Sequence, residues 1–65
     1  MREWLIAFRK ARGLRQKEVA EAVGVSQPTY WQYEHGVVTP GVVVAKKLGA
    51  YLGFDWTVFY SDKSA

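Results

Sequence analysis

The apolar residues of this 65-residue chain recur at helical spacing, and turn-forming residues divide them into five segments. Val19 and Val23 lie one helical turn apart, and Gly24 follows them directly. This spacing predicts an amphipathic helix, and glycine suits its end because glycine adopts positive φ at no steric cost. The same pattern predicts helices over about residues 2–12, 16–23, 27–35 and 40–52, and a short helix that follows Asp55 and ends near Phe59.

The expected fold class is therefore all-α, a compact arrangement of five helices. No strand pattern competes, because the valine-rich piece 42–44 is short and continues into AKKLGAYL. We expect a single domain over residues 1–65, with an ordered core from about 2 to 60 and a frayed tail at 61–65.

Helix starts and buried faces follow from the same pattern. Ser26 is placed to cap the third helix, and Pro28 then lies in the first turn, where a missing N–H is harmless. Thr39 and Pro40 are expected to start the fourth helix in the same way. The side chains expected to face inward are Leu5, Phe8, Tyr30, Tyr33, Val43, Leu48, Tyr51 and Leu52.

Residues 16–34, with the sequence QKEVAEAVGVSQPTYWQYE, predict two short helices that cross steeply around a tight turn. Ala20 has no bulk to hold the second helix away, Gly24 permits the turn, and Val25 fills the angle between the helices. This helix-turn-helix pattern is typical of proteins that bind DNA.

The charge distribution points to the same class of partner. The chain has a net charge of +3 and a pI near 9.5, and five of its nine Lys and Arg residues lie between positions 9 and 17. A basic cluster beside a helix-turn-helix indicates phosphate binding. The alternative is a solvated helix end, because cations also favour helix C-termini. The cluster consists of Arg9, Lys10, Arg12, Arg15 and Lys17.

Composition argues against several other classes. The chain has no cysteine and one histidine, so neither a thiolate metal site nor convergent catalytic groups are expected. We expect no enzyme, metal, cofactor or small-molecule ligand. Lys46, Lys47 and Asp55 interrupt the apolar region after Pro40, and no apolar signal segment follows Met1, so we expect a soluble, cytoplasmic protein without a membrane span.

The chain resembles the lambda-repressor-like, Cro-type helix-turn-helix domain (the xenobiotic-response-element family) over roughly residues 4–60. The resemblance lies in the combination of LxxFR near the start, then GLRQ, VAEAVGVSQPTYWQYEHG, TP and LGAYLGFDW. It implies a compact five-helix domain that binds operator DNA, commonly as a dimer on a palindromic or pseudo-palindromic site.

The resemblance also implies residue roles. Gln16 matches a glutamine that contacts a phosphate and braces the recognition helix, and Arg9 and Glu34 match a structural ion pair between the first and third helices. Gln27 matches a position that often reaches a base edge, and glutamine suits adenine because it accepts from N6 and donates to N7. The expected base contacts are Gln27, Pro28, Trp31 and Gln32. The expected DNA backbone contacts are Arg12, Arg15, Gln16, Lys17, Ser26 and Thr39.

The sequence departs from the family pattern in three places. Arg15 stands where relatives usually have Thr, Ser or Asn to cap the second helix, which predicts a weaker helix start. The loop at Val37 and Val38 lacks the usual Lys or Arg, so backbone N–H groups near Thr39 and Gly41 would have to hold the phosphate there. In addition, Pro28 and Trp31 replace more usual polar residues.

Trp56 and Val58 are expected at the interface of a homodimer. At positions i and i+2 of one helix, two apolar side chains cannot both face one core. One of them is therefore expected to face a partner subunit or to lie under the C-terminal tail.

Two hypotheses for function follow from the sequence. The first is a sequence-specific transcriptional regulator, a small dimeric repressor that binds a palindromic operator of double-stranded DNA with its third helix in the major groove. The alternative is a protein-interaction module on the same fold (an antitoxin, antirepressor or adaptor), which the apolar Trp31, Val37 and Val38 favour. Salt dependence of binding separates the two, because phosphate contacts release counterions and apolar contacts do not.

Overall fold

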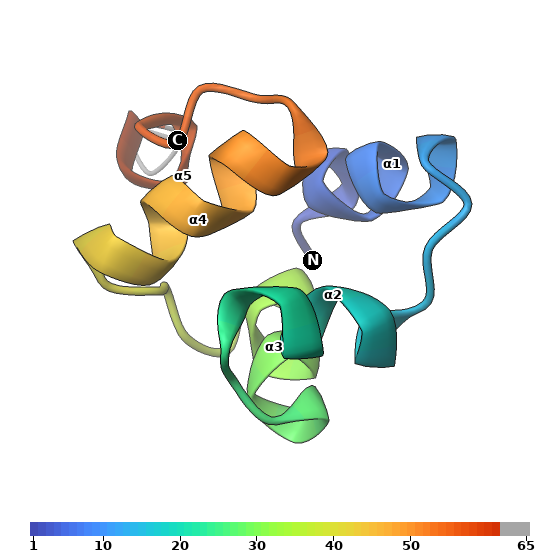
Figure 1. Cartoon of the computed structure of the whole chain (residues 1–65). Helices are drawn as coiled ribbons and strands as arrows, with labels where there is room; N and C mark the ends of the chain where they lie inside the picture. The colour runs from blue at the N-terminus through green and yellow to red at the C-terminus, as the bar shows by residue number, and fades with distance from the viewer. Residues whose placement is uncertain (62–65) are drawn as a thin grey trace.

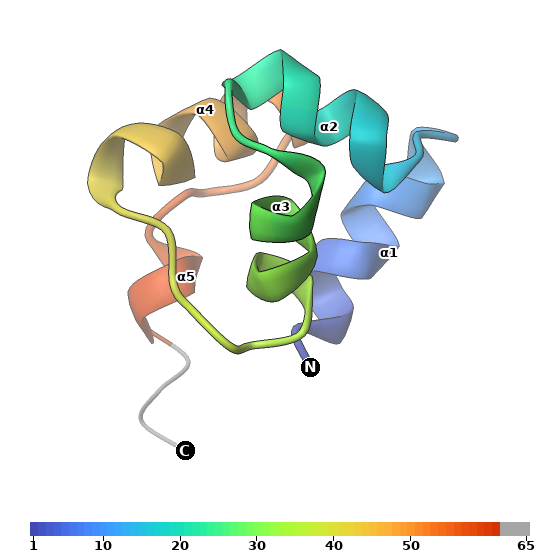
Figure 2. The ribbon, with the colours of Figure 1, turned by 90° about the horizontal axis from the view of Figure 1, so that it is seen from below.

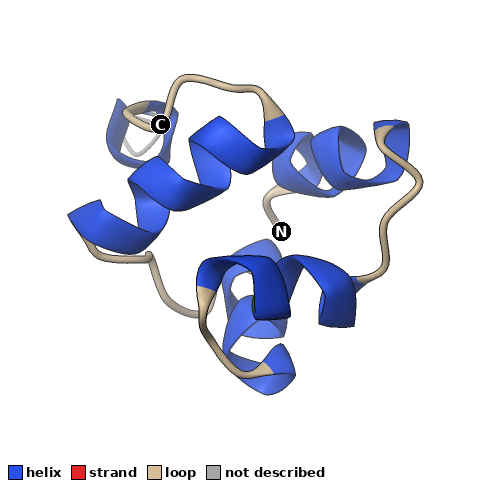
Figure 3. Ribbon diagram, viewed as in Figure 1, coloured by secondary structure: helices blue, strands red, loops and turns tan. Residues whose placement is uncertain are grey.

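The computed structural model describes residues 1–61 and contains five helices joined by short loops (Figure 1). No strand occurs in this part of the chain (Figure 3), so the expected all-α class is confirmed. The predicted tail, residues 61–65, lies outside the described residues except for Ser61, which is the last residue of the fifth helix. The helices are α1 Glu3–Ala11, α2 Gln16–Val23, α3 Gln27–Glu34, α4 Val42–Leu52 and α5 Val58–Ser61.

Two helix starts differ from the prediction. The α4 helix begins at Val42 with Gly41 at its N-cap, so the prediction that Thr39 caps this helix is wrong. The reason is tertiary: the Thr39 hydroxyl oxygen accepts a hydrogen bond of 2.6 Å from Arg2. The α5 helix begins three residues after Asp55, because the Asp55 carboxylate accepts from the backbone and hydroxyl of Thr57 and closes a separate turn first.

The core lies where α1, α2, α3 and α4 meet. The α4 helix contributes Ala45, Leu48, Gly49 and Leu52, a stripe at i, i+3, i+4 and i+7 that forms one helix face. The apolar side chains of the core are Leu5, Val19, Ala20, Val23, Tyr30, Tyr33, Ala45, Leu48, Leu52 and Phe59.

Three side chains that were expected in the core are exposed instead. Val43 is 67% exposed and Tyr51 is 39% exposed, because the register that buries Leu48 turns both of these side chains toward solvent. Phe8 is 38% exposed, and its ring lies 5.2 Å from that of Phe54 at the edge of the core.

The α4 helix approaches the following turn very closely at Gly49. A Cβ atom on this residue would lie 2.6 Å from the carbonyl oxygen of Phe54 and 3.2 Å from the Cβ of Trp56. Only glycine permits this approach, and Gly53, with φ of 87°, then ends the helix. This packing brings the segment that carries α5 back across α4.

Arg2 joins three parts of the fold. Its backbone N–H donates to the carbonyl of Glu34 at 2.7 Å, and its guanidinium donates to the carbonyls of Tyr33 and Val38 at 2.6 and 2.9 Å. The guanidinium carbon also lies 5.3 Å from the centre of the Phe59 ring. A cation at the C-terminal end of a helix stabilises the helix dipole. Arg2 therefore holds the end of α3, the loop after it and α5 together.

The α3 helix occupies the centre of one face of the molecule. Seen from below, it lies at the centre, with α2 above it, α1 on one side and α4 and α5 on the other (Figure 2). Gln27, Pro28 and Trp31 are exposed on its outward side. Within residues 1–61, no helix combines the length and the apolarity that a bilayer crossing requires.

Candidate nucleic-acid interface

The connection between α2 and α3 is a tight turn with a regular helix start. Gly24 adopts φ of 79°, and the N–H of Val25 then donates to the carbonyl of Ala20 at 3.0 Å. The Ser26 hydroxyl accepts from the N–H of Thr29 at 3.2 Å and so caps α3, with Pro28 in the first turn. These local features follow the sequence prediction and fix the angle of α3 against α2.

The two sides of α3 differ sharply. Tyr30, Tyr33 and Glu34 are buried on the inner side. On the outer side, the Trp31 ring is 42% exposed and stacks on the imidazole of His35, with ring centroids 3.8 Å apart. Gln27 and Pro28 are also exposed, whereas Gln32 is partly buried. The outer side therefore presents a short, uncharged ridge with one aromatic ring held in place.

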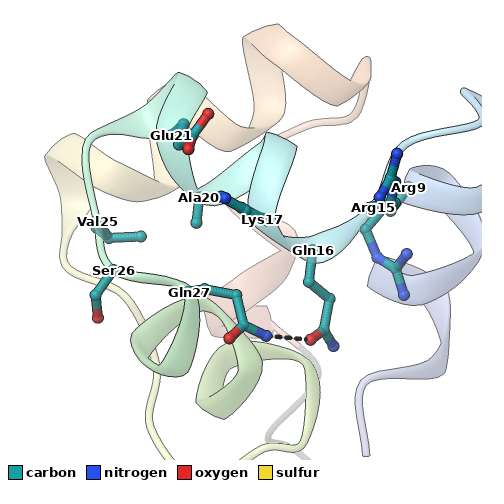
Figure 4. Close-up of a pocket in the computed structure, with 9 residues that line it drawn as sticks. All are labelled: Arg9, Arg15, Gln16, Lys17, Ala20, Glu21, Val25, Ser26 and Gln27. Atoms are coloured by element: carbon teal, nitrogen blue, oxygen red, sulfur yellow. Dashed lines mark hydrogen bonds between the residues drawn. The ribbon is translucent and has the colours of Figure 1, made fainter.

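The N-terminal ends of α2 and α3 flank an open hollow (Figure 4). Both helix starts carry partial positive charge, which favours an anion. The hollow is lined by Arg9, Arg15, Gln16, Lys17, Ala20, Glu21, Val25, Ser26 and Gln27. Three of these nine side chains are cationic and one is anionic. Arg9 is paired with Glu34, so Arg15 and Lys17 are the cations that a phosphate in the hollow would meet.

A chain of hydrogen bonds runs from this hollow into the core. Gln27 Nε2 donates to Gln16 Oε1 at 2.8 Å (Figure 4), and Gln16 Nε2 donates to Glu34 Oε1 at 2.9 Å. Arg9 Nε lies 2.6 Å from Glu34 Oε2, and Arg9 also donates to the carbonyl of Leu14. The first residue of α3 is thus connected through α2 to the last residue of α3 and to α1.

The Arg9–Glu34 ion pair is the strongest electrostatic feature of the site. Glu34 is fully buried, and the side chain of Arg9 is 12% exposed. Burial alone would raise the pKa of Glu34, but hydrogen bonds that include those from Arg9 and Gln16 outweigh it and hold this pKa below its ordinary value. The Glu34 carboxylate likewise raises the pKa of Arg9. Both groups are therefore charged at neutral pH.

The start of α2 has a partial substitute for the missing cap. The side chain of Arg15 makes no capping hydrogen bond, as expected for a residue without an acceptor. Instead, Glu18 Oε1 accepts from the backbone N–H of Arg15 at 2.8 Å. The signal was present in the sequence, since Glu18 lies three residues after the N-cap, as in a capping box.

The structure gathers most of the predicted DNA-contacting residues but not all of them. Arg15, Gln16, Lys17, Ser26 and Gln27 line the hollow, and Pro28, Trp31 and Gln32 continue along α3. Thr39 lies in the loop just before α4.

Arg12 lies apart from this group. Its guanidinium contacts the C-terminal end of α4, where a Cβ atom on Gly53 would lie 2.5 Å from Nη2. The structure therefore gives Arg12 a packing contact outside the hollow.

The two residues predicted at a dimer interface are both partly buried. The Trp56 ring lies 5.2 Å from the Lys46 ammonium and 6.0 Å from the Tyr60 ring. Val58 is the first residue of α5. The turn before α5 therefore packs its Trp56 ring against α4, and Val58 follows directly after this turn.

Comparisons with known proteins agree with this geometry. The family model described as "Helix-turn-helix" matches residues 5–59. The chain is similar to the uncharacterized HTH-type transcriptional regulator YqaF of Bacillus subtilis, with 45% identity over 62 residues that cover 95% of this chain and 82% of the relative. It is also similar to an uncharacterized HTH-type transcriptional regulator of Methanothermobacter thermautotrophicus, with 38% identity over 53 residues, 82% of this chain and 77% of the relative.

A third relative carries a more specific name. The chain is 37% identical over 55 residues to the cryptic phage CTXphi transcriptional repressor RstR of Vibrio cholerae. The match covers 85% of this chain but only half of that repressor. No solved structure gives a significant match to the chain.

Proposed function

The chain belongs to the helix-turn-helix family, and on this premise we propose that it is a small repressor that binds a palindromic operator as a homodimer. Relatives that are named transcriptional regulators and a repressor support a DNA-binding regulator of transcription, which is not an enzyme. The observation that carries the proposal is the exposed outer side of α3 beside a basic hollow at two helix N-termini.

The hollow is the proposed site for a backbone phosphate. Arg15 and Lys17 supply charge, and Gln16 has a second N–H on Nε2 that remains free to donate. On the other side of α3, the start of α4 at Gly41 has no side-chain cap, so its first N–H groups can hold a second phosphate beside Thr39. Two such contacts would fix the orientation of α3 on the duplex.

The outer side of α3 is the proposed reading surface. Gln27, Pro28, Trp31 and Gln32 would lie against base edges in the major groove. Because the ring of Trp31 stacks on His35, it is held in place and can press against a thymine methyl group without losing much conformational freedom. Readout by Gln27 and Trp31 would favour sites rich in A·T pairs.

Dimerisation through α5 and its preceding turn completes the proposal. Trp56 and Val58 lie on this surface and would contact the partner subunit. A two-fold axis there would place the two α3 helices in successive major grooves, about 34 Å apart. An occupied operator would block polymerase, which makes repression the expected outcome.

Selection of bound sequences from a random pool of duplex DNA tests the proposal. We expect an enriched motif with two-fold symmetry and half-sites one helical turn apart. A motif without symmetry would contradict the dimer, and no enrichment at all would contradict DNA binding.

Replacing Gln27 by alanine should reduce affinity for the selected site by about 1–3 kcal/mol and relax base choice at one position of each half-site. The reason is the loss of a bidentate contact to a base. Fluorescence anisotropy with the selected duplex and its single-base variants measures both effects. Lys10→Ala is the matched control, because Lys10 is exposed on α1 outside the hollow and should leave base choice unchanged.

Replacing Val58 by aspartate should weaken self-association by about 2 kcal/mol, or roughly thirtyfold in the dimer dissociation constant, because an unpaired carboxylate would be buried at the interface. Analytical ultracentrifugation measures the change, and circular dichroism checks that the monomer is folded. The control is Val43→Asp, which places the same charge on a 67% exposed position of α4. Equal effects of the two substitutions would exclude α5 as the interface.

A protein-interaction module remains the second candidate function. Trp31, Val37 and Val38, on α3 and the loop that follows it, are 42%, 59% and 40% exposed. Exposed apolar side chains that form one patch are typical of protein-interaction sites. A partner protein would cover them with apolar contacts, and its binding would then depend little on salt.

A further inference from the structure

The hydrogen-bond chain from Glu34 to Gln27 has a fixed direction. An ionised carboxylate can only accept hydrogen bonds, so the group of Gln16 that contacts Glu34 must be Nε2. The other end of the Gln16 amide, Oε1, therefore faces Gln27 and can only accept. Gln27 must in turn donate from its own Nε2. Charge on one buried residue thus sets the orientation of two successive side-chain amides.

This orientation decides what Gln27 can offer to DNA. One N–H of its Nε2 is used in the bond of 2.8 Å to Gln16, which leaves Oε1 and the second N–H. Adenine presents a donor at N6 and an acceptor at N7 in the major groove, which matches this pair of groups. Guanine presents two acceptors, O6 and N7, so Oε1 would face an acceptor there.

We propose that Glu34 is a positioning residue that sets base specificity: through Gln16 it fixes the amide orientation of Gln27 and so favours adenine over guanine. This inference rests on the proposed function, because it requires α3 to read bases. Glu34 contacts no base, since it is fully buried. Without its charge, the Gln16 amide can turn and donate to Gln27 Oε1, which leaves two N–H groups on Gln27 for guanine.

Glu34→Gln is the first test variant, because Arg9 can only donate and would hold the oxygen of the new amide. The NH2 group of that amide would then face Gln16, which reverses the direction of the hydrogen-bond chain. Gln16→Met is the second, because it removes the connection but leaves the Arg9–Glu34 pair intact. The control is Leu5→Val, a substitution in the core on α1 that touches neither the hollow nor the hydrogen-bond chain. It should lower the melting temperature and leave base preference unchanged.

The probe is the duplex selected from the random pool by the unaltered protein, together with its adenine-to-guanine variant at the position that responds to Gln27→Ala. The ratio of the two affinities is the readout, since loss of stability or of a phosphate contact affects both duplexes alike. We expect preference for adenine to fall roughly tenfold in Glu34→Gln and in Gln16→Met, the order of one lost base contact. The variant that combines Glu34→Gln with Gln16→Met should lose no more preference for adenine than either single variant.

An unchanged ratio in folded Glu34→Gln would overturn the inference while DNA binding stands. The inference would also be overturned if the base position that responds to Gln27→Ala is not an adenine in the selected duplex. If Glu34→Gln does not fold, Gln16→Met decides in its place, and an unchanged ratio there overturns the inference equally.

A second measurement needs no DNA. In the side-chain amide NMR spectrum of the free protein, we expect one Nε2 proton of Gln27 to show the shift of a hydrogen-bonded donor and to lose it in Glu34→Gln. If the unaltered protein selects no duplex, the proposed function fails, and this spectrum still decides the amide orientation: unchanged Gln27 signals in Glu34→Gln would overturn it.

Discussion

Replacing Arg9 by methionine is expected to destabilise the protein by about 3–5 kcal/mol at pH 7, because it leaves the Glu34 carboxylate buried without a cation. Glu34 is fully buried and lies 2.6 Å from Arg9, so solvent cannot take over the role of the lost partner. Small domains have total stabilities of about 5–15 kcal/mol, so much of the folding free energy would be lost. Urea denaturation monitored by circular dichroism measures the effect.

The pH dependence separates this mechanism from simple loss of packing. In the unaltered protein, the pKa of Glu34 is lower than its ordinary value of 4.5, so the pair stabilises the fold above that pH, and the stabilisation is lost as the pH falls through the lower folded value. In Arg9→Met, burial without a cation should raise this pKa. The variant should then recover stability on acidification, where the unaltered protein loses it.

Arg15→Met is the matched control for this experiment, because Arg15 is exposed and its side chain makes no capping bond. It should change stability by no more than about 0.5 kcal/mol. Parallel pH profiles for Arg9→Met and the unaltered protein would show that the ion pair does not act as described.

Raising the salt concentration from 50 to 200 mM should reduce affinity for the selected duplex by at least about 10³-fold, provided that the dimer contacts six or more phosphates. The physical reason is counterion release at the hollow and at the start of α4. Fluorescence anisotropy at several salt concentrations gives the slope of log affinity against log salt. An apolar partner protein bound over Trp31, Val37 and Val38 would produce a slope near zero.

The slope of log affinity against log salt concentration also identifies the residues that contact phosphates. Replacing Arg15 and Lys17 together by glutamine should reduce its magnitude by about 0.9 for each phosphate contact that is lost. Lys47→Gln is the control, because this exposed lysine lies on α4 outside the hollow. Equal slopes for the Arg15 and Lys17 double variant and for Lys47→Gln would show that the phosphate does not bind in the hollow.

The sequence predicted α2, the turn and the start of α3 well because local chemistry decides them. Gly24 is required by a positive φ, and Ser26 caps the helix through its own side chain. The prediction for the start of α4 was wrong because a contact distant in the sequence decides it. Arg2, 37 residues away, holds the Thr39 hydroxyl, and no local pattern reveals this contact.

In the candidate site, too, local sequence decides some features and the packing of the helices decides others. The spacing of Gln16 and Gln27 placed them at two helix starts, but their mutual hydrogen bond and the link to Glu34 depend on how the helices pack. Likewise, periodicity cannot tell which of several apolar faces of α4 is buried, so Val43 and Tyr51 were assigned to the core although they are exposed. Arg12 was grouped with its basic neighbours in the chain, whereas packing places it against Gly53.

The contacts of Arg2 have a practical consequence for handling the protein. The second residue of the chain is hydrogen-bonded to the end of α3, the proposed reading helix, and to the loop beside it. An affinity tag or fluorescent reporter fused ahead of Met1 would lie one residue from these bonds and close to the end of α3. An N-terminally tagged preparation should therefore be cleaved before any DNA affinity is compared, and a C-terminal tag should be removed before self-association is measured, because it would follow α5.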